Sequence, residues 1–409
     1  MDLSYSEDYE KFRREVKQFL KEHWTDADIK SAPPPDSRAM MMGAIVRTDG
    51  RATAFRTKAG ERGYLYRHVP KRYGGGEQPS DPLKATIIAE EFRKAQAPGE
   101  LMGQGPSMLV PTLVEHGTEE QKQKFVRDTL LGQITWCQGY SEPGSGSDLA
   151  SLRTRAVLEG DYWVVNGQKI WTSNADTSEW MFCLVRTEPE APKHQGISYL
   201  LIDMQTPGIT VRPLRQMTGD ADFNEVFLDN VRVPAKNLVG KRGQGWIVSR
   251  STLKHERALI GSSVLSRRTL EGVIMLAQAL NLRGQPAIKD PVIRKRIVEL
   301  ETKVLANEYH GFRLLTMQTR NQEPGVAGLV SKLYGTQLGY DVARVAMDMM
   351  GDRGMLAPGE DSAPAMGMFV TAYMWSLGVL IAGGTANIQR NVIAERGFGL
   401  PRDAAASRR

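Results

Sequence analysis

The residues best suited to bind a polar ligand lie in two short stretches between positions 138 and 173. The first stretch reads QGYSEPGSGSD, in which Pro143 ends regular structure and the following glycines and serines leave backbone N–H groups that a ligand can approach closely. The second reads NGQKIWTS, in which Asn166-Gly167 predicts a type I′ hairpin turn that places Trp171 and Ser173 on the returning strand. This pattern indicates a β-domain with a binding face, and the alternative is an ordinary surface loop.

A carboxylate that could act as a base lies in the helical stretch LKHERALIG, which begins at Leu253. Glu256 is three or four residues from Leu253, Leu259 and Ile260, so we expect it on a largely apolar helix face. Partial desolvation on this face would raise the pKa of Glu256, which suits a group that takes up and releases a proton. The alternative is that Glu256 forms a stabilising ion pair with a neighbouring arginine. His255 and Glu256 resemble half of an HExxH zinc motif, but Leu259 occupies the second ligand position, so no metal site is expected.

The composition indicates an ordinary folded protein with two or three domains. The chain has 409 residues, 41% of them hydrophobic, and a net charge of +6 that is dispersed rather than collected in a basic block. Nucleic-acid binding is therefore not expected. Cys137 and Cys183 are predicted to be buried reduced thiols, and the N-terminus begins directly with an amphipathic helix instead of a signal or transit peptide. We expect a cytoplasmic protein.

Hydrophobic periodicity divides the chain into helical, β and helical parts. We predict an N-terminal helical domain over residues 1–132 with an irregular insertion at about 25–62, a β-domain over 133–240 and a helical domain over 241–409. Glu90 and Glu91 are expected on a solvated helix face. The uncharged stretch 363–389 is long enough to raise a membrane span, but its glycines and amides favour a buried core helix. Neither a Rossmann fingerprint nor a P-loop is present.

Four motifs in this order resemble those of the acyl-CoA dehydrogenase family: SEPGSGSD, NGQKIWTS, NEVFLDNVRVP (224–234) and GGTANIQRNVIAERGFGLPR (383–402). Their separations also match, and the resemblance covers nearly the whole chain. It implies an α+β fold with an N-terminal helical domain, a middle β-barrel-like domain and a C-terminal helical bundle.

The resemblance also implies which residues contact FAD and the acyl-CoA substrate. The positions that match FAD contacts are Gln138, Tyr140, Ser141, Trp171, Ser173, Thr385 and Asn387, and Arg283 is a candidate substitute for an arginine by which many members reach the FAD of a neighbouring subunit. The positions that match substrate contacts are Gly146, Ser147, Arg257, Gly383, Gly384, Met102 and Leu109. For Met102 and Leu109, a plain core position is the alternative.

In many members the base is a glutamate immediately before Gly-Thr in the C-terminal motif, but Gly383 stands there in this chain. Members such as isovaleryl-CoA dehydrogenase take the base from a Leu-x-x-Glu-Arg pattern, which Leu253, Glu256 and Arg257 match. The resemblance therefore implies that Glu256 is the base. The backbone N–H of Gly383 could still donate to the thioester oxygen.

The implied reaction is the FAD-dependent oxidation of an acyl-CoA to a trans-2-enoyl-CoA, as in fatty acid β-oxidation, with electrons passing to an electron-transferring flavoprotein. A homotetramer or a hetero-oligomer with a homologue is expected. The alternatives are a non-catalytic or half-active acyl-CoA-binding subunit, and a flavin oxidase or monooxygenase on the same fold.

Overall fold

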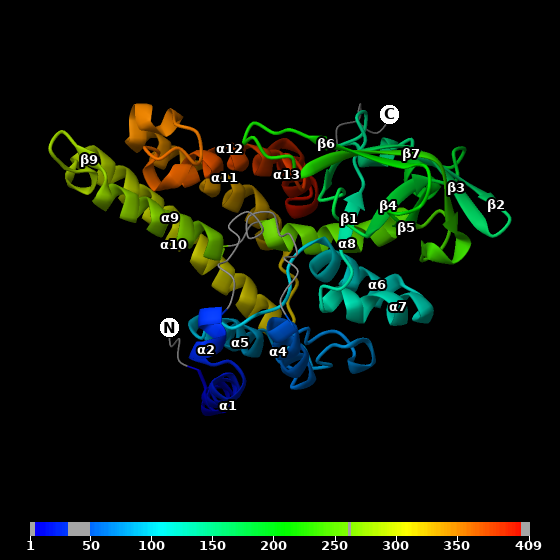
Figure 1. Ribbon diagram of the computed structural model, residues 1–409, viewed down its shortest axis with the longest axis horizontal. Coiled ribbons are helices and arrows are strands. Elements are labelled where there is room, and N and C mark those ends of the chain that lie inside the picture. Colours follow the sequence, from blue (N-terminus) through cyan, green and yellow to red (C-terminus); the bar gives the residue numbers. More distant parts are fainter. Residues whose placement is uncertain (1–4, 32–49, 261–262, 402–409) are drawn as a thin grey trace. The chain divides into compact units, whose positions relative to one another are not determined.

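The computed structural model of the chain describes residues 5–31, 50–260 and 263–401, which form two compact units (Figure 1). The first unit comprises Met1–Gln216 and Asp220–His255, and it holds the N-terminal helices and a β-sheet. The second comprises Met217–Gly219 and Glu256–Arg409, and it is mainly helical. The boundary falls within one helix, α8 (Gly245–Ile260). The predicted order of helical, β and helical parts is confirmed.

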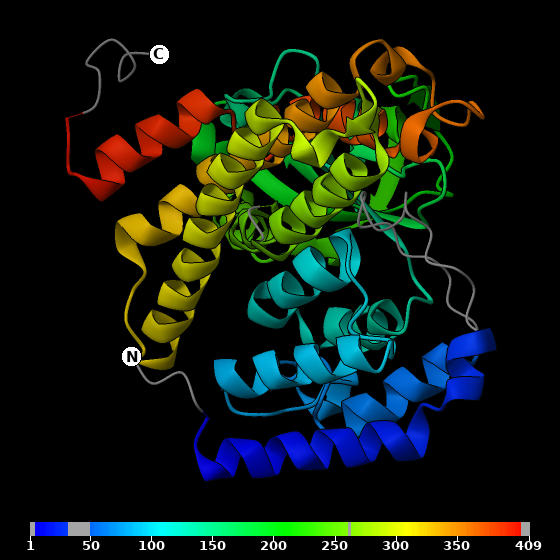
Figure 2. The ribbon, with the colours of Figure 1, turned by 90° about the vertical axis from the view of Figure 1, so that its left-hand side faces the viewer.

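Aromatic side chains fill the core between the N-terminal helices. Helix α1 (Glu7–His23) lies beside α5 (Pro82–Lys94), as Figure 2 shows, and buries the expected apolar stripe at Val16, Phe19 and Leu20. The chain then continues through a π-helical turn, η2, and two helices. Their bounds are η2 (Gln104–Leu109), α6 (Val110–His116) and α7 (Glu119–Leu130).

The insertion predicted at about 25–62, for which one strand pair or a short helix was expected within irregular structure, is helical over most of its described residues. Residues 26–31 form α2 (Asp26–Ser31) and residues 50–61 form α4 (Gly50–Glu61), while 32–49 lie outside the described residues. Helix α4 packs through Phe55, whose ring centroid lies 5.2 Å from that of Trp24. Its buried residues span less than two turns, so the sequence shows no sustained helical period.

Glu91 is also not on a solvated face, because only 3% of it is exposed. Its Oε1 accepts hydrogen bonds from Arg13 at 2.5 Å and from Lys94 at 2.9 Å. Burial alone would raise the pKa of Glu91, but these two bonds hold it below its usual value. The apolar stripe of α5 therefore includes a buried charge that Arg13 of α1 and Lys94 of α5 neutralise.

Eight strands form a single sheet in the order β6-β7-β3-β2-β4-β5-β8, and β1 pairs in parallel with β4. Within the described residues β6 and β8 are the two ends of this strand order, and the predicted middle β-domain is confirmed. The bounds are β1 (Trp136–Gly139), β2 (Arg155–Glu159), β3 (Tyr162–Ser173), β4 (Trp180–Arg186), β5 (Ile197–Asp203), β6 (Ile209–Leu214), β7 (Phe223–Pro234) and β8 (Leu238–Val239). Cys137 and Cys183 are buried free thiols, as expected.

The hairpin predicted at Asn166-Gly167 is wrong, because β3 runs through both residues. The chain turns between β2 and β3 at residues 160–161 instead, where Glu159 pairs with Tyr162. At Gly167 the pairing of β3 with β7 shifts, and an added Cβ would lie 2.7 Å from the Cα of Thr154. The glycine therefore serves a close backbone approach within a strand and not a turn.

The second unit packs three long helices around one apolar core. These are α9 (Ser263–Ala279), α10 (Pro291–Thr319) and α11 (Gly325–Met350), followed by α12 (Met368–Ile381) and α13 (Ala386–Val392). A short hairpin, β9 (Asn281–Leu282) and β10 (Gln285–Pro286), connects α9 to α10.

Helix α12 is not the buried core helix that the sequence suggested. The stretch Pro364–Ile381 has a mean hydropathy of 1.5, high enough for a candidate membrane span, yet only 11% of it is buried in this chain. Ala365 and Met366 interrupt the helical backbone with φ values of 49° and 51°. The remaining α-helix has 14 residues and is about 21 Å long, shorter than a hydrocarbon core of about 30 Å. Most of the apolar surface of α12 is therefore not covered by the described residues of this chain.

Candidate active site

A bulge in β3 presents the indole of Trp171. The pairing of β3 with β7 shifts between Lys169 and Thr172, so Ile170 and Trp171 lie in the bulge. Trp171 has a φ of 58°, a conformation that is costly for a bulky residue and is concentrated at functional sites. Its side chain is 59% exposed and meets Phe223 edge to face, with 6.0 Å between ring centroids. The bulge thus aims a large aromatic ring outward.

The end of β1 is bonded to this bulge. The N–H of Ile170 donates to the carbonyl of Ser141 at 2.9 Å, and Lys169 Nζ donates to the carbonyl of Tyr140 at 3.2 Å. Gln138, Ser141 and Ser173 are half-buried, and Tyr140 is buried. The structure therefore brings together the two stretches that the sequence singled out.

The glycine loop after Ser141 holds its own shape. Glu142 and Ser145 exchange two backbone hydrogen bonds of 2.9 Å, and Ser145 Oγ donates to the carbonyls of Asp148 and Leu149. Gly146 and Ser147 are exposed, and a Cβ added at Gly146 would meet no atom within 4 Å. The open backbone of this loop suits an extended polar ligand such as a phosphate.

A buried ion pair under this surface escaped the sequence analysis. Lys169 Nζ lies 2.9 Å from Glu142 Oε1, and the side chains are 0% and 8% exposed. Burial alone would raise the pKa of Glu142, but the Lys169 ammonium, with hydrogen bonds from Thr154 and Arg153, keeps it lowered. Strand alternation offered a signal, because Lys169 lies an even number of residues after the buried Trp163 and Val165 of the same strand.

In the second unit, the loop 383–385 is held by two buried side chains. Gln389 Nε2 donates to the carbonyl of Gly383 at 3.1 Å, and Lys332 Nζ donates to that of Gly384 at 2.8 Å. Lys332 is 3% exposed. The glycines have φ values of 62° and 100°, which favour glycine over any other residue. Thr385 caps α13 by accepting from the N–H of Ile388.

The remaining predicted residues are placed as follows. Glu256 and Arg257 lie in the C-terminal part of α8, as the helical pattern predicted, but their side chains are outside the described part of the structure. Asn387 is exposed and accepts from Arg390 at 3.1 Å. Arg283 is exposed at the turn between β9 and β10.

The two positions suggested for an acyl-chain pocket differ. Met102 is 50% exposed, just before η2, whereas Leu109 is fully buried in the core of the first unit. Leu109 thus occupies the plain core position that the sequence left open as the alternative.

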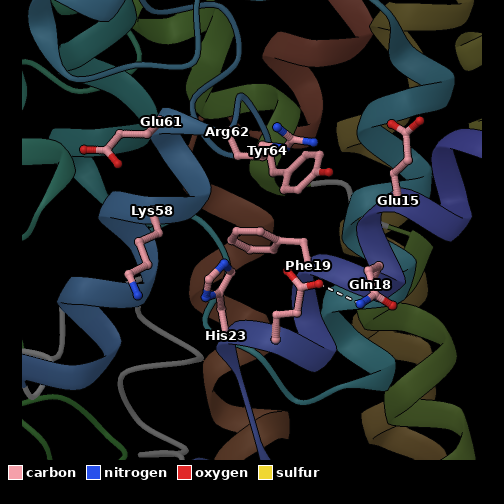
Figure 3. A pocket seen from close by; sticks show the side chains of 9 residues that line it. Glu15, Gln18, Phe19, His23, Lys58, Glu61, Arg62 and Tyr64 are labelled. Carbon is pink, nitrogen blue, oxygen red and sulfur yellow. Dashed lines mark hydrogen bonds between the residues drawn. The ribbon is translucent and has the colours of Figure 1, made fainter.

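A cavity of about 630 Å³ lies elsewhere in the first unit, between α1 and α4 (Figure 3). Its floor includes the adjacent rings of Phe19 and His23, and charged side chains such as Glu61 and Arg62 surround it. None of the predicted site residues lines it. The bulge and the glycine loop, and not this cavity, therefore define the candidate site of the first unit.

Comparison with known proteins places this geometry in a family. Models of the N-terminal, middle and C-terminal domains of acyl-CoA dehydrogenase match residues 6–133, 137–231 and 243–398. Acyl-CoA dehydrogenase IpdE1 of Mycobacterium tuberculosis is 39% identical over 337 residues, which cover 82% of this chain and 84% of that relative. Acyl-CoA dehydrogenase FadE34 of the same organism is 37% identical over 378 residues, which cover 92% of this chain but 50% of that relative.

Two solved structures share the whole fold. The Tcur3481-Tcur3483 steroid ACAD has a TM-score of 0.77 and 28% identity, and the ChsE4-ChsE5 complex from Mycobacterium tuberculosis has a TM-score of 0.76 and 29% identity. Each match covers 98% of this chain and 100% of the other. With all three domains matched and close relatives over most of its length, the chain belongs to the acyl-CoA dehydrogenase family of enzymes.

Proposed function

We propose that this enzyme oxidises an acyl-CoA to a trans-2-enoyl-CoA with bound FAD, and that Glu256 removes the α-proton. The choice of Glu256 as the base rests on the residue found at position 383. This residue is a glycine in a left-handed conformation, at the position where many members have the catalytic glutamate. Glu256 follows Leu253 and precedes Arg257 on α8, as in members whose base lies on this helix.

The residues of the first unit fit a flavin. A flat heterocycle with hydrogen-bonding edges needs an aromatic wall beside hydroxyl and amide donors, and Trp171, Ser173 and Ser141 supply these groups around one bulge. Gln138 and Tyr140 would complete this edge. In the second unit, we propose that Thr385 and Asn387 contact the ADP half of FAD and that Arg283 reaches the FAD of a neighbouring subunit.

Bound FAD would accept the hydride from the substrate's β-carbon. The chain's own residues would do the rest: the Glu256 carboxylate takes the α-proton, and the backbone N–H of Gly383 donates to the thioester oxygen. We assign Gly146, Ser147 and Arg257 to the CoA part of the substrate, and Gly384 and Met102 to the acyl side.

We propose that the acyl group is bulky and bears rings. Two observations support this: the base lies on the helix, as in members that accept branched or bulky groups, and a relative of the same fold is a steroid ACAD. Relatives also form two-component assemblies such as the ChsE4-ChsE5 complex, so we propose a tetramer, built either from this chain alone or with a homologue. An electron-transferring flavoprotein in the cytoplasm would be the electron acceptor, in β-oxidation of such a side chain.

An anaerobic substrate screen tests this proposal. The purified protein, alone and with a co-expressed homologue, is mixed with straight, branched and ring-bearing acyl-CoAs while the visible flavin absorbance is recorded. We expect bleaching with ring-bearing thioesters. A protein that bleaches only with the homologue present would support the half-active subunit, and rapid oxygen consumption with substrate would support an oxidase. Bleaching only with short straight chains would contradict the proposed substrate class.

A further inference from the structure

We propose that the buried Lys169–Glu142 ion pair helps to position the flavin ring. The pair does so by fixing the glycine loop and Trp171 relative to each other. This inference rests on the proposed binding of FAD. It assigns a role to two residues that contact neither the indole nor the exposed part of the loop.

The pair joins three segments that are distant in sequence. Lys169 lies on β3, and its Nζ donates to Glu142 Oε1 at 2.9 Å and to the carbonyl of Tyr140, beyond the end of β1, at 3.2 Å. Glu142 also accepts from the backbone N–H groups of Arg153 at 2.6 Å and Thr154 at 2.8 Å, just before β2. Each charge therefore has several partners, which a buried ion pair requires.

These bonds fix the orientation of the backbone at Ser141. The carbonyls of Tyr140 and Ser141 are both directed at β3, toward Lys169 Nζ and the N–H of Ile170. In a trans peptide the N–H points opposite to the carbonyl, so the N–H of Ser141 is directed away from Lys169. It has no acceptor among the described residues. The pair thus leaves one amide donor available at the edge of the loop.

The same bonds support the unfavoured conformation of Trp171. A residue with positive φ persists only where its surroundings hold it in place. Lys169 is two residues before Trp171, and Ile170 is bonded to Ser141. Two apolar residues could fill the volume of the pair, but they would remove the hydrogen bond that Lys169 donates to the Tyr140 carbonyl.

The test uses Lys169→Met, Glu142→Gln and the double variant. Thr187→Val serves as the control, because it removes a buried hydroxyl just after β4 that bonds to Ser198 Oγ at 2.7 Å and not to Lys169 or Glu142. Each protein is stripped of FAD, checked for folding by circular dichroism and titrated with FAD. Flavin fluorescence gives the Kd, and the visible spectrum of the bound flavin reports its surroundings.

We expect each single variant to bind FAD at least about tenfold more weakly, the scale of one lost charge-assisted hydrogen bond, with a changed flavin spectrum. The double variant should regain thermal stability relative to the single variants, because no unpaired charge remains, but not FAD affinity. The control should keep both affinity and spectrum. Wild-type affinity and spectrum in any folded variant lacking Lys169 or Glu142 would overturn the positioning role. A wild-type protein that binds no FAD would instead overturn the proposed function, and this inference with it.

Discussion

Trp171 combines an unfavoured backbone conformation with an exposed aromatic ring. Its mutation should therefore change the stability of the protein and its affinity for FAD in opposite directions. Trp171→Gly relieves the positive φ, worth about 1 kcal/mol, and loses little buried surface because the ring is 59% exposed. We expect the FAD-free variant to be at least as heat-stable as wild type and to bind FAD more weakly. Tyr162→Gly, at an ordinary position of the same strand, should destabilise the protein without weakening FAD binding. A large loss of stability in Trp171→Gly would contradict this account.

Glu142 should make stability depend on pH in the acid range. Its folded pKa is lowered, so the stabilisation is fully present above the ordinary glutamate value of 4.5 and is lost as the pH falls through the lower folded value. We therefore expect the difference in melting temperature between wild type and Glu142→Gln to shrink as the pH is lowered below 4.5. Thermal scans across this range measure it. A difference that stays constant would contradict the lowered pKa.

The sequence was informative about residues where a motif is local. It identified the two stretches around Ser141 and Trp171, because glycines, hydroxyls and an aromatic residue stand close together there. It did not reveal that Glu142 and Lys169 meet, because their contact depends on which strand faces which loop. It also misjudged Asn166-Gly167, since a strong turn signal can equally mark a bulge.

At the scale of elements, the loop 383–385 depends on α11 for its shape. Lys332→Met would remove the donors to the carbonyls of Gly384 and Leu380. If the N–H of Gly383 holds the thioester oxygen, flavin reduction by substrate should slow by about tenfold or more. Lys303→Met is the control, because it removes a half-exposed lysine that pairs with Asp341 between α10 and α11. Rapid-mixing kinetics with equal rates in both variants would show that the loop needs no support from Lys332.

Element types were predictable where the period is long and regular. Helices α1 and α5 and the strands from β4 to β7 follow their apolar patterns closely. Helix α4 was missed because its buried face is short, and the order of the strands was not predictable because the pairing is non-local. The predicted burial of α12 failed because apolar composition does not say whether the same chain or another covers a helix.

At the scale of the whole molecule, the exposed apolar side chains of α12 predict that the chain is not a monomer. Ile381 is 66% exposed and Met368 is 53% exposed. Ile381→Glu should dissociate the assembly, because it would bury an unpaired charge. Val157→Glu, at a 43% exposed position on β2, should leave the assembly intact. Sedimentation velocity distinguishes the two variants, and a monomeric wild type without any homologue would favour assembly with a partner.

The boundary between the two units falls within α8, between His255 and Glu256. The FAD contacts proposed at Trp171 and Ser173 lie in the first unit, while Glu256 and the Gly383 loop belong to the second. Only the sequence points to Glu256 as the base, because Gly383 stands where many family members have the catalytic glutamate. A substitution of Glu256 is therefore the most direct test of the proposed reaction.

The decisive measurement is the anaerobic rate of flavin reduction in Glu256→Gln after rapid mixing with a substrate that bleaches the wild type. We predict unchanged FAD content and acyl-CoA binding but a rate at least about 100-fold lower, the smaller end of what a general base contributes. Glu271→Gln, at an exposed glutamate on α9, should reduce at the wild-type rate. A wild-type rate in Glu256→Gln would contradict the account, because another group would then have to remove the proton.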